Sequence, residues 1–377
     1  MKAIIIRGRG DAAITVAKIP EIRDREGYIL VKTSAVAVNP SDWKHIDFMW
    51  VGDPTGTRPG LDYAGTVVEV GVGVEPKDRL KPGDRVFGIC NGSYVIIHPL
   101  GKTNNSADRI GAATSNVREP EDGTFAEYLV AKACFAIKIP DIMQDTEACT
   151  IGSVAAQAQG LYQSLQLPLP DVEPLTTRKI PILIYGASTA SGVMGIQWAK
   201  MSNCTVVVTC SPKNFAYLKE LGADFCVDYH AEDCAAQIQA FTKGRLKHAW
   251  DCISTVESAR ICAAAMSALG GHYCSLLFLT SSVLKKVNPR ITCSTVLGYT
   301  ILGEDIEKET VVKKRPEDFE HGKMFWKTAE NLLLSGRFRP VQQVVNQGGR
   351  GLDGILKGLQ YLKQGKVSAQ KLVYTIG

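Results

Sequence analysis

The feature that most constrains the fold of this chain is a regular alternation of apolar strand patterns and helical patterns between residues 179 and 277. Apolar stretches of strand length alternate with segments whose apolar residues recur at three- and four-residue steps. The expected strands cover 179–185, 205–210, 225–227, 249–253 and 272–277, and the expected helices cover 192–201, 214–221 and 259–269. Strands that are apolar throughout are buried on both faces, so this segment predicts an α/β unit with a doubly wound parallel sheet.

The segments on either side of this alternation differ from it. Short β-branched runs separated by turn signals favour a small antiparallel barrel in the first third of the chain, and these runs cover 4–6, 28–37 and 65–70. Residues 141–167 show helical periodicity, with Asp145 as the expected N-cap. The elements expected in the last part are helices around 325–333 and at 352–363 and a strand at 371–376.

Length and composition exclude several classes of protein. The 377 residues predict two or three domains, and 45% apolar and 21% charged residues are ordinary values for a globular protein. The net charge of +5 is spread along the chain, so we expect no nucleic-acid partner. The N-terminus lacks the apolar core of a secretory signal, and the uncharged stretch 261–284 is broken by Gly270-Gly271-His272. We therefore expect a cytoplasmic protein that does not span a membrane.

The eleven cysteines form no metal-binding pattern. No two of them stand in C-x-x-C spacing, and none has a histidine at a usual zinc-ligand interval. The sequence therefore predicts no bound metal.

The first strand of the α/β unit runs into a loop of small residues, Gly186-Ala187-Ser188-Thr189-Ala190-Ser191-Gly192, which opens the next helix. Backbone N–H groups and the helix dipole at such a turn can hold the pyrophosphate of a dinucleotide. The glycine spacing is G-x5-G-x2-G, so Ser188 and Thr189 would supply hydroxyl donors where a glycine backbone otherwise approaches. A tight strand-to-helix turn without a ligand is the alternative.

The end of the second strand indicates which dinucleotide would bind. A carboxylate there would accept hydrogen bonds from the ribose of NAD, but the sequence continues Cys210-Ser211-Pro212-Lys213-Asn214 with no acid. Ser211 and Lys213 can meet the additional phosphate of NADP, and the same residues also fit an ordinary Ser N-cap followed by Pro. Tyr229, after the third strand, could pack on the adenine edge or be a surface aromatic.

Further segments resemble one superfamily. They are Asn39-Pro40-Ser41-Asp42-Trp43-Lys44, Pro59-Gly60-Leu61-Asp62-Tyr63-Ala64-Gly65, the loop 186–195, Gly270-Gly271-His272-Tyr273 and Gly365-Lys366-Val367-Ser368. These motifs are similar to those of medium-chain dehydrogenase/reductases of the quinone oxidoreductase type, over essentially the whole chain. Within that superfamily, the segments 185–191, 210–214 and 252–258 most resemble the fungal trans-acting polyketide enoyl reductases, the lovastatin enoyl reductase type.

The resemblance implies a Rossmann domain inserted into a GroES-like β-rich substrate domain. The expected boundaries are 1–150 and 304–377 for the two parts of the GroES-like domain, and 151–303 for the Rossmann domain. Zinc-dependent relatives carry a Cys in the segment that corresponds to 39–44, a Gly-His-Glu near 60–62 and a lobe of four cysteines, none of which is present here. The resemblance therefore implies a zinc-independent reductase.

The resemblance also implies which residues contact the cofactor and the acyl substrate. For NADPH these are Ser41, Asp42, Trp43, Lys44, Gly186, Ser188, Thr189, Ala190, Ser191, Gly192, Ser211, Pro212, Lys213, Asn214, Tyr229, Leu276, Leu277, Val367 and Ser368. For the substrate they are Glu147, Ala148, Cys149, Thr150, Ile151, Gly152, Ser153, Val154, Leu297, Gly298, Tyr299, Thr300 and Ile301.

The implied activity is reduction of an α,β-unsaturated acyl thioester, with hydride transfer from NADPH to the β carbon. Lys44 is the candidate catalytic residue, which would stabilise the developing enolate oxygen or else contact only the ribose or phosphate of the cofactor. Tyr63 could donate the proton to the α carbon or be a packed barrel residue. A proton from solvent would need no residue.

The implied partner is the acyl-carrier domain of a polyketide or hybrid synthase, which presents the carrier-bound enoyl substrate. Carrier proteins are usually acidic, so a basic cluster could bind one by electrostatic attraction. The candidate clusters are Lys285, Lys286 and Arg290, and the run 313–315; the alternative is that these are ordinary solvated cations. The family implies a monomer or a homodimer. The alternatives are a stand-alone quinone or enone oxidoreductase, and a cofactor-binding protein without turnover.

Overall fold

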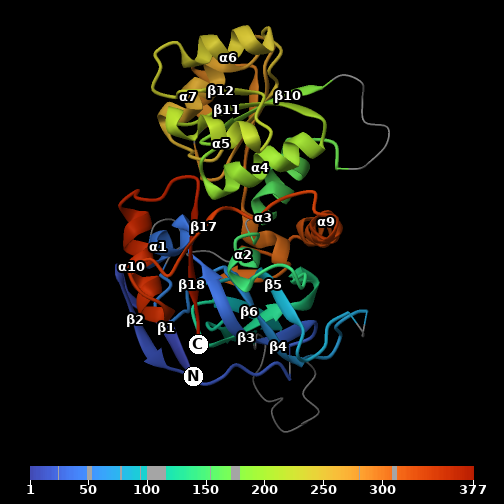
Figure 1. The fold of residues 1–377 in the computed structure, drawn as a ribbon, viewed down its shortest axis with the longest axis vertical. Coiled ribbons are helices and arrows are strands. Elements are labelled where there is room, and N and C mark those ends of the chain that lie inside the picture. Colours follow the sequence, from blue (N-terminus) through green and yellow to red (C-terminus); the bar gives the residue numbers. More distant parts are fainter. Residues whose placement is uncertain are drawn as a thin grey trace.

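The computed structural model of the chain describes residues 1–23, 25–48, 53–76, 79–93, 95–99, 116–152, 154–170, 179–279, 281–307 and 312–377. These residues form two lobes, one above the other in Figure 1. The upper lobe holds the parallel sheet and most of the helices that cover it, while the lower lobe is rich in strands and contains both chain termini. Helices α2 (Asp145–Ala148) and α3 (Val154–Gln157) lie between the two lobes.

The upper lobe contains a six-stranded parallel sheet in the order β12-β11-β10-β13-β14-β15. Its strands are β10 (Ile180–Tyr185), β11 (Cys204–Thr209), β12 (Phe225–Val227), β13 (His248–Asp251), β14 (Gly271–Ser275) and β15 (Ile291–Thr295). The strand order reverses between β10 and β13, which is the switch point where sheets of this kind bind their ligands. The expected doubly wound parallel sheet is confirmed, although the sequence pattern missed the edge strand β15.

Alternate residues of the central strand point to opposite faces of this sheet. Ile182 and Ile184 pack into one core, whereas Leu183 and Tyr185 pack into the other. The first face is covered by α4 (Ala190–Met201) and α5 (Phe215–Glu220), and the second by α6 (Cys234–Thr242) and α7 (Val256–Ala265), with α8 (Ser281–Lys285) beside β15. Because both faces are covered, most buried strand positions are apolar, and the buried polar residues Thr209, Asp251 and Ser275 stand at the carboxyl ends of their strands.

The main sheet of the lower lobe has seven strands and combines segments from both ends of the chain. Its order is β17-β18-β3-β4-β5-β9, and β8 pairs with β3. The bounds are β3 (Tyr28–Ala37), β4 (Asp62–Val70), β5 (Arg85–Ile89), β8 (Tyr128–Lys132), β9 (Ala136–Lys138), β17 (Gln343–Val345) and β18 (Lys371–Thr375). Since β18 pairs antiparallel with β3, the parallel sheet is inserted into a β-rich unit. The boundaries at residues 150 and 303 stay predictions.

Smaller elements complete the structure. The remaining strands are β1 (Lys2–Gly8) and β2 (Asp11–Val16), which form a hairpin, and β6 (Val95–Pro99), β7 (Asn116–Glu119) and β16 (Asp305–Glu307), which form a three-stranded sheet. The remaining helices are α1 (Pro40–Ile46), α9 (Pro316–Leu334) and α10 (Gly351–Lys363), and the short turns are η2 (Ala133–Phe135), η4 (Pro212–Asn214) and η5 (Gly298–Leu302). The elements expected at 352–363 and 371–376 are therefore confirmed as α10 and β18.

The continuous helix expected at 141–167 is wrong. The segment consists of α2, α3 and a π-helical piece, η3 (Ala158–Ser164). A Cβ atom at Gly152, between α2 and α3, would collide with the carboxylate of Asp62, so a close approach of the chain to β4 replaces the helix. The expected N-cap is also wrong: Gln144 is the N-cap, and the Asp145 carboxylate accepts a hydrogen bond from Arg85 at 2.6 Å.

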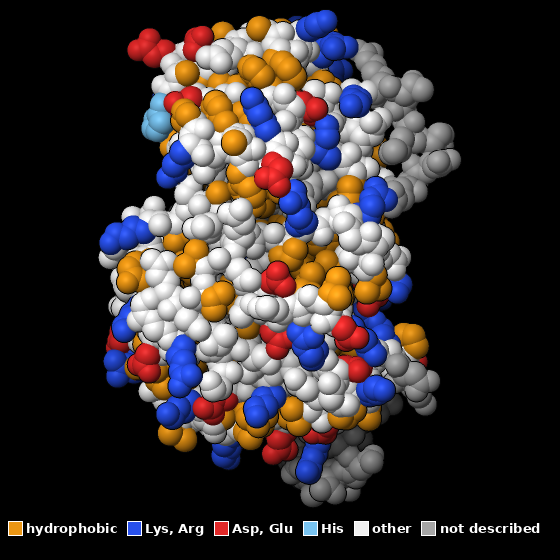
Figure 2. Space-filling view, in the orientation of Figure 1, with side chains coloured by type: hydrophobic (Ala, Val, Ile, Leu, Met, Phe, Trp, Pro, Cys, Tyr) orange, Lys and Arg blue, Asp and Glu red, His pale blue; other side chains and the backbone are white. Residues whose placement is uncertain are grey.

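Aromatic side chains hold α9 against the upper lobe. The ring centroid of Phe325 in α9 lies 4.6 Å from that of Trp198 in α4 and 4.9 Å from that of Tyr162 in η3. Paired buried rings stabilise a core beyond the area they bury. Hydrophobic side chains also gather on the surface at the waist between the lobes (Figure 2). Among the helices of the described ranges, none is long and apolar enough to cross a membrane.

Candidate active site

Glycines shape the turn between β10 and α4. Gly186 has a φ of 73°, and a Cβ atom there would collide with Ile253. A Cβ atom at Gly192 would lie 2.5 Å from the Cα atom of Ala187, so only glycine lets the first turn of α4 approach the loop. Thr189 is the N-cap of α4, and its Oγ1 accepts a hydrogen bond from the N–H of Gly192 at 3.0 Å. These contacts fix the start of the helix.

The start of α4 presents backbone donors to solvent. In the part of the chain that the structure describes, the N–H groups of Ser188, Ala190 and Ser191 have no protein acceptor, as helix geometry requires of the first N–H groups. The helix has 12 residues, and its dipole adds partial positive charge at these donors. The donors, the dipole and the close approach at Gly192 fit the pyrophosphate of a dinucleotide.

Segments that are distant in sequence meet at this loop. The N–H of Ala369 donates to the backbone oxygen of Ser188 at 2.8 Å. The Nδ2 of Asn214 donates to the Oγ of Ser368 at 3.1 Å. The structure therefore brings together three groups of expected cofactor contacts, from the loop, from 211–214 and from 367–368.

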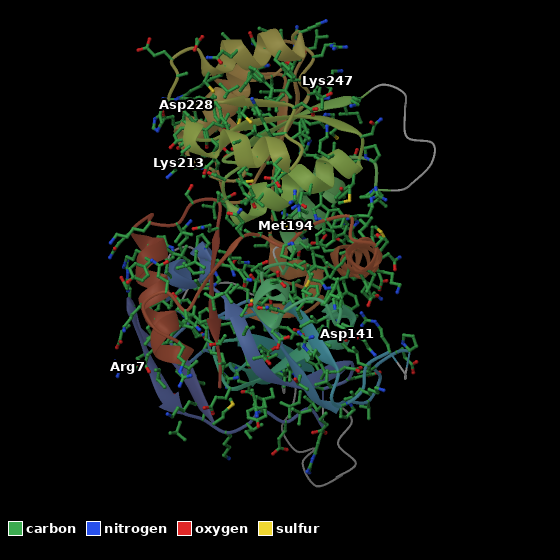
Figure 3. All side chains as sticks on the ribbon, viewed as in Figure 1. Arg7, Asp141, Met194, Lys213, Asp228 and Lys247 are labelled. Atoms are coloured by element: carbon green, nitrogen blue, oxygen red, sulfur yellow. The ribbon has the colours of Figure 1, made fainter. Side chains whose placement is uncertain are left out.

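The end of β11 carries a hydroxyl and a cation. Ser211 occupies the N-cap position of η4, but its side chain makes no capping hydrogen bond, so the hydroxyl is not used for the turn. Lys213 is exposed at the margin of the upper lobe (Figure 3). Tyr229 is half-buried, and its ring centroid lies 6.3 Å from that of Tyr185. Ser211 and Lys213 are therefore available to a ligand, while Tyr229 packs at the edge of the sheet.

A buried carboxylate organises the ends of β13 and β14. Asp251 is fully buried and accepts hydrogen bonds from the N–H of Ser254 at 2.8 Å and from the hydroxyl of Tyr273 at 2.7 Å. The Oγ of Ser254 accepts in turn from the N–H groups of Leu276 and Leu277 at 3.0 and 3.2 Å. These contacts fix the two leucines expected at the cofactor. The sequence analysis missed Asp251 and Ser254, although an acid at the end of an apolar strand is a usable signal.

In the lower lobe, a buried ion pair lies next to the start of α1. Lys371 of β18 pairs with Asp62 of β4, and their side chains are only 2% and 3% exposed. The N-cap residue Asn39 donates from Nδ2 to Asp62 at 2.9 Å, and its N–H donates to Asp42 at 2.7 Å. Burial raises the pKa of Asp42 well above its usual value. Asp42, expected at the cofactor, thus uses its carboxylate to cap its own helix, and the sequence analysis missed Lys371.

The rest of α1 presents a cation and links to η5. Ser41 and Trp43 are half-buried, and burial lowers the pKa of Lys44, whose Nζ lies 5.7 Å from the centroid of the Trp43 ring. His45 is buried, and its Nε2 lies 3.2 Å from the hydroxyl oxygen of Tyr299 in η5. A hydrogen bond therefore joins α1, which carries expected cofactor contacts, to Tyr299, which is an expected substrate contact.

Most residues expected to contact the acyl substrate are buried or half-buried, and their contact with a substrate stays a prediction. The buried members of this set are Ala148, Cys149, Thr150, Ile151, Gly152, Val154, Thr300 and Ile301. The half-buried members are Glu147, Leu297, Gly298 and Tyr299, and Ser153 lies outside the described residues. Thr300 contacts both Gln159 and Asp318, and Glu147 accepts the N–H of Gln144 at 2.9 Å in a capping box. Among the described residues of this set, Tyr299 is hydrogen-bonded to α1.

Gln157 connects the waist of the molecule to the cofactor loop. Its side chain is fully buried at the end of α3, and its Nε2 donates to the backbone oxygen of Ser191 at 2.9 Å. The sequence analysis missed this residue, for which the only signal is a glutamine on an apolar helical face.

Tyr63 is fully buried in the core between β4 and its neighbours, where burial raises the pKa of its hydroxyl. Its position matches that of a packed residue. Within the described ranges, no three His, Cys, Asp or Glu side chains gather as a metal ion would require.

Known protein families and solved structures share this fold. The family profile "Alcohol dehydrogenase GroES-like domain" matches residues 25–141, and the profile "Zinc-binding dehydrogenase" matches residues 190–276. An alcohol dehydrogenase superfamily protein from Novosphingobium aromaticivorans superposes with a TM-score of 0.73 at 20% identity over 100% of both chains. The CurK enoyl reductase superposes with a TM-score of 0.71 at 13% identity, over 100% of this chain and 99% of that one. Fold and loop together define a medium-chain dehydrogenase/reductase that uses a pyridine nucleotide.

Sequence relatives narrow this class. Trans-enoyl reductase resD of Aspergillus sclerotiorum is 41% identical over 393 residues, which cover 100% of both chains. Trans-enoyl reductase TOXD of Cochliobolus carbonum is 40% identical over 309 residues, which cover 81% of this chain and 92% of the relative. The chain belongs to the family of fungal trans-enoyl reductases, as the sequence motifs predicted.

Proposed function

We propose that the protein is an NADPH-dependent enoyl reductase that acts in trans on an α,β-unsaturated acyl thioester carried by a polyketide or hybrid synthase. The identity of 41% to trans-enoyl reductase resD along the full length of both chains carries this proposal. The donors at the start of α4 add a place for the dinucleotide that the reduction requires.

The preference for NADPH rests on the end of β11. No carboxylate follows this strand, whereas the exposed ammonium of Lys213 and the hydroxyl of Ser211 stand there without a structural task. A dianionic phosphate would accept a charge-assisted hydrogen bond from the first and an ordinary one from the second.

The chain must hold the alkene near the cofactor and stabilise charge on the thioester oxygen. When bound, NADPH supplies the hydride for the β carbon. Lys44 is our candidate for stabilising the enolate, because its ammonium is partly removed from water, where a charge acts more strongly. The alternative role of Lys44, a contact to the ribose or phosphate, predicts an effect on cofactor affinity and not on the chemical step.

For the proton at the α carbon, we favour Tyr299 over Tyr63. Tyr63 is fully enclosed in the lower core, whereas Tyr299 is half-buried and is hydrogen-bonded to His45, the neighbour of Lys44. In this scheme the Tyr299 O–H bond breaks as the new C–H bond forms. Solvent then returns a proton to the half-buried tyrosinate, and the hydrogen bond to His45 holds the phenol oxygen in place.

For the carrier partner, we favour the cluster of Lys285, Lys286 and Arg290. All three side chains are exposed at one edge of the upper lobe. In the run 313–315, by contrast, Lys313 pairs with Asp305 at 2.9 Å and Arg315 lies 3.8 Å from Asp318. The first cluster is therefore the one that keeps its charge for an acidic partner.

Stopped-flow absorbance of NADPH tests the function. We expect fast oxidation with a crotonyl thioester on a carrier protein, slower oxidation with the coenzyme A thioester, and little with a free enone. No turnover with any thioester would contradict the proposal, and equal rates on thioesters and free enones would support a stand-alone quinone or enone reductase.

A further inference from the structure

A groove of about 440 Å³ opens on the lower lobe, in a part of the molecule that the proposed function does not use. It lies between the β1–β2 hairpin and the segment that follows β7. Ile5 and Pro20 contribute apolar surface to its walls, and Ile19, which is 45% exposed, lies at its mouth. Arg58 forms part of the inner wall.

Arg58 is a buried cation that forms no ion pair among the described residues, although Glu121 and Asp122 act on its charge from a longer distance. Its side chain is 2% exposed, and within the described ranges the guanidinium donates one hydrogen bond, from Nη1 to the backbone oxygen of Tyr128 at 3.4 Å, which is long for such a bond. The buried Nε has no acceptor among the same residues. No Asp or Glu of the described residues lies within ion-pairing distance of the guanidinium. A buried charge left in this state is costly unless something else pairs with it.

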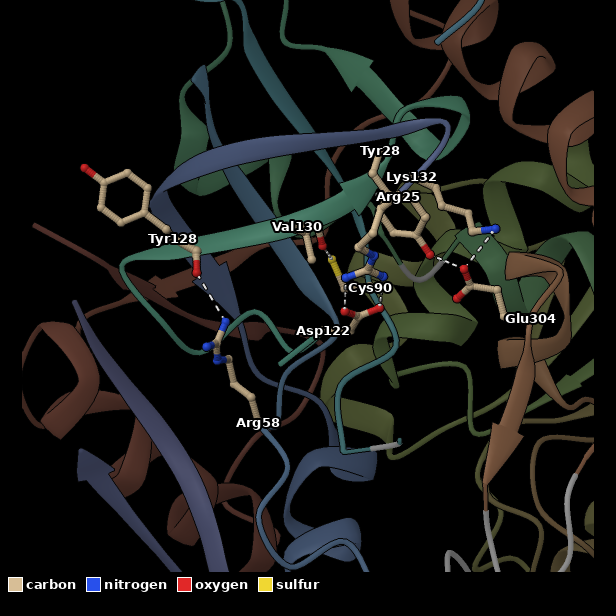
Figure 4. Close-up of polar contacts among 9 residues, drawn as sticks. All are labelled: Arg25, Tyr28, Arg58, Cys90, Asp122, Tyr128, Val130, Lys132 and Glu304. Carbon is tan, nitrogen blue, oxygen red and sulfur yellow. Dashed lines mark hydrogen bonds and ion pairs between the residues drawn. The ribbon is translucent and has the colours of Figure 1, made fainter. Parts of the chain in front are cut away.

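The neighbouring arginine shows what a satisfied guanidinium looks like in this lobe. Arg25 donates from Nη1 and Nη2 to the two carboxylate oxygens of Asp122 at 2.6 and 2.7 Å. Figure 4 shows this pair within a connected network, while Arg58 lies apart with a single dashed line to Tyr128. The same groove borders both arginines, so the difference between them is not one of solvent access.

The charges around the groove favour an anion. Besides Arg58, the cations are Lys18 and Arg23, which are exposed at the mouth, and Arg25 is neutralised by Asp122. Glu21 and Glu121 oppose them, which leaves an excess of one positive charge. A planar guanidinium can donate parallel hydrogen bonds to the two oxygens of a carboxylate or phosphate, and in Arg58 one terminal nitrogen is already bonded to Tyr128.

We propose that this groove binds a small organic anion whose carboxylate or phosphate group pairs with Arg58 while an apolar part lies against Ile5, Ile19 and Pro20. Lys18 and Arg23 stabilise the bound anion from the mouth. The site is separate from the cofactor loop and does not depend on the proposed reductase activity.

Isothermal titration calorimetry at low salt tests this site, with inorganic phosphate, acetate and hexanoate as probes. The titrations use the Lys213→Ala protein, so that phosphate bound at the end of β11 does not contribute. We expect measurable binding, with hexanoate tighter than acetate if the apolar wall contributes. If phosphate alone binds, the natural ligand is a phosphate ester; if the carboxylates bind better, it is an organic acid.

Substitutions in the same background assign the binding to the groove. Arg58→Met should weaken binding by about tenfold or more, since a hydrogen bond to a charged group is worth about 1.5–3 kcal/mol. Should that variant fail to fold, Arg23→Ala and Lys18→Ala, both at exposed positions, should still weaken binding severalfold. Arg7→Ala removes an exposed cation paired with Asp11 in the same lobe and should change nothing. Absence of binding by every probe, or binding that none of the three groove variants weakens, would overturn the proposal.

Discussion

The two lobes present polar groups in opposite ways. In the upper lobe, the donors proposed to hold the cofactor are backbone N–H groups at the start of α4, placed by glycines that allow close approach. In the lower lobe, the polar groups are buried charged side chains, above all the pair Lys371–Asp62. The first arrangement arises from neighbours in sequence, whereas Lys371 and Asp62 stand 309 positions apart. Substitutions at the cofactor loop should therefore act first on ligand binding, and those at the buried charges first on stability.

Breaking the buried pair should have the largest effect. In Lys371→Met, the Asp62 carboxylate would stay buried without its cation, which costs about 3–5 kcal/mol of unfolding free energy. Urea unfolding followed by far-UV circular dichroism measures this loss. Lys313→Met is the matched control, because the Lys313 side chain is 77% exposed and its pair with Asp305 is worth at most about 1 kcal/mol. Equal losses of unfolding free energy in the two variants would contradict the importance of the buried pair for the stability of the lower lobe.

Tyr299→Phe tests the contact that joins the lobes. If Tyr299 supplies the proton, kcat should fall about a hundredfold while the affinity for NADPH stays unchanged. Single-turnover kinetics with a crotonyl thioester measures the first quantity, and fluorescence titration the second. Tyr128→Phe, at a half-buried tyrosine whose hydroxyl points away from the network in Figure 4, is the control. An unchanged kcat would indicate that solvent protonates the α carbon.

Gly192→Ala tests the backbone site of the upper lobe. The added Cβ would lie 2.5 Å from the Cα of Ala187, so the loop must shift, at a cost of about 1–3 kcal/mol. We expect NADPH to bind about tenfold more weakly, with a smaller loss of stability than in Lys371→Met. At Gly8 in β1, a Cβ would meet nothing within 4 Å, so Gly8→Ala should leave NADPH affinity unchanged. A normal affinity in Gly192→Ala would show that the loop does not hold the dinucleotide.

Lys213→Ala tests a side chain, rather than the backbone, of the proposed cofactor site. Loss of one charge-assisted hydrogen bond should weaken NADPH about tenfold and leave NADH nearly unaffected. Fluorescence titration with both nucleotides gives the ratio. Lys219→Ala removes another exposed cation, on α5, and serves as the control. An equal effect on both nucleotides would disprove the phosphate assignment.

The smallest effect concerns an exposed carboxylate of the lower lobe. Hydrogen bonds from the hydroxyl and the backbone N–H of Thr55 lower the pKa of Asp53. The stability that these hydrogen bonds add to the folded state is present above the pKa of Asp53 in the unfolded chain, about 3.9. It is lost as the pH falls through the lower pKa of Asp53 in the folded protein. Thr55→Val should therefore be less stable than wild type at about pH 6, and the gap should narrow towards about pH 3. Urea midpoints that differ equally at both pH values would contradict this linkage.

The sequence predicts the upper lobe better than the lower one for a physical reason. β10, the turn at Gly186 and α4 follow from residues next to one another, so periodicity and glycine spacing suffice. The break at Gly152 and the caps of α1 depend on Asp62, which only the folded chain brings near. Likewise, Gln157 and Ser254 act through hydrogen bonds to distant backbone groups, and a pattern within one segment does not reveal them.

The pairing of β18 with β3 sets an order of events during synthesis. Strand β3 leaves the ribosome long before β18, so it waits for this neighbour until all the elements between them have been made. The parallel sheet needs only residues between β10 and β15, and domains generally fold as units once they emerge. On a ribosome stalled after β15, the parallel sheet should therefore be folded, while the main sheet of the lower lobe still lacks β18. The unpaired edge of β3 is then the part of the nascent chain that most needs a chaperone.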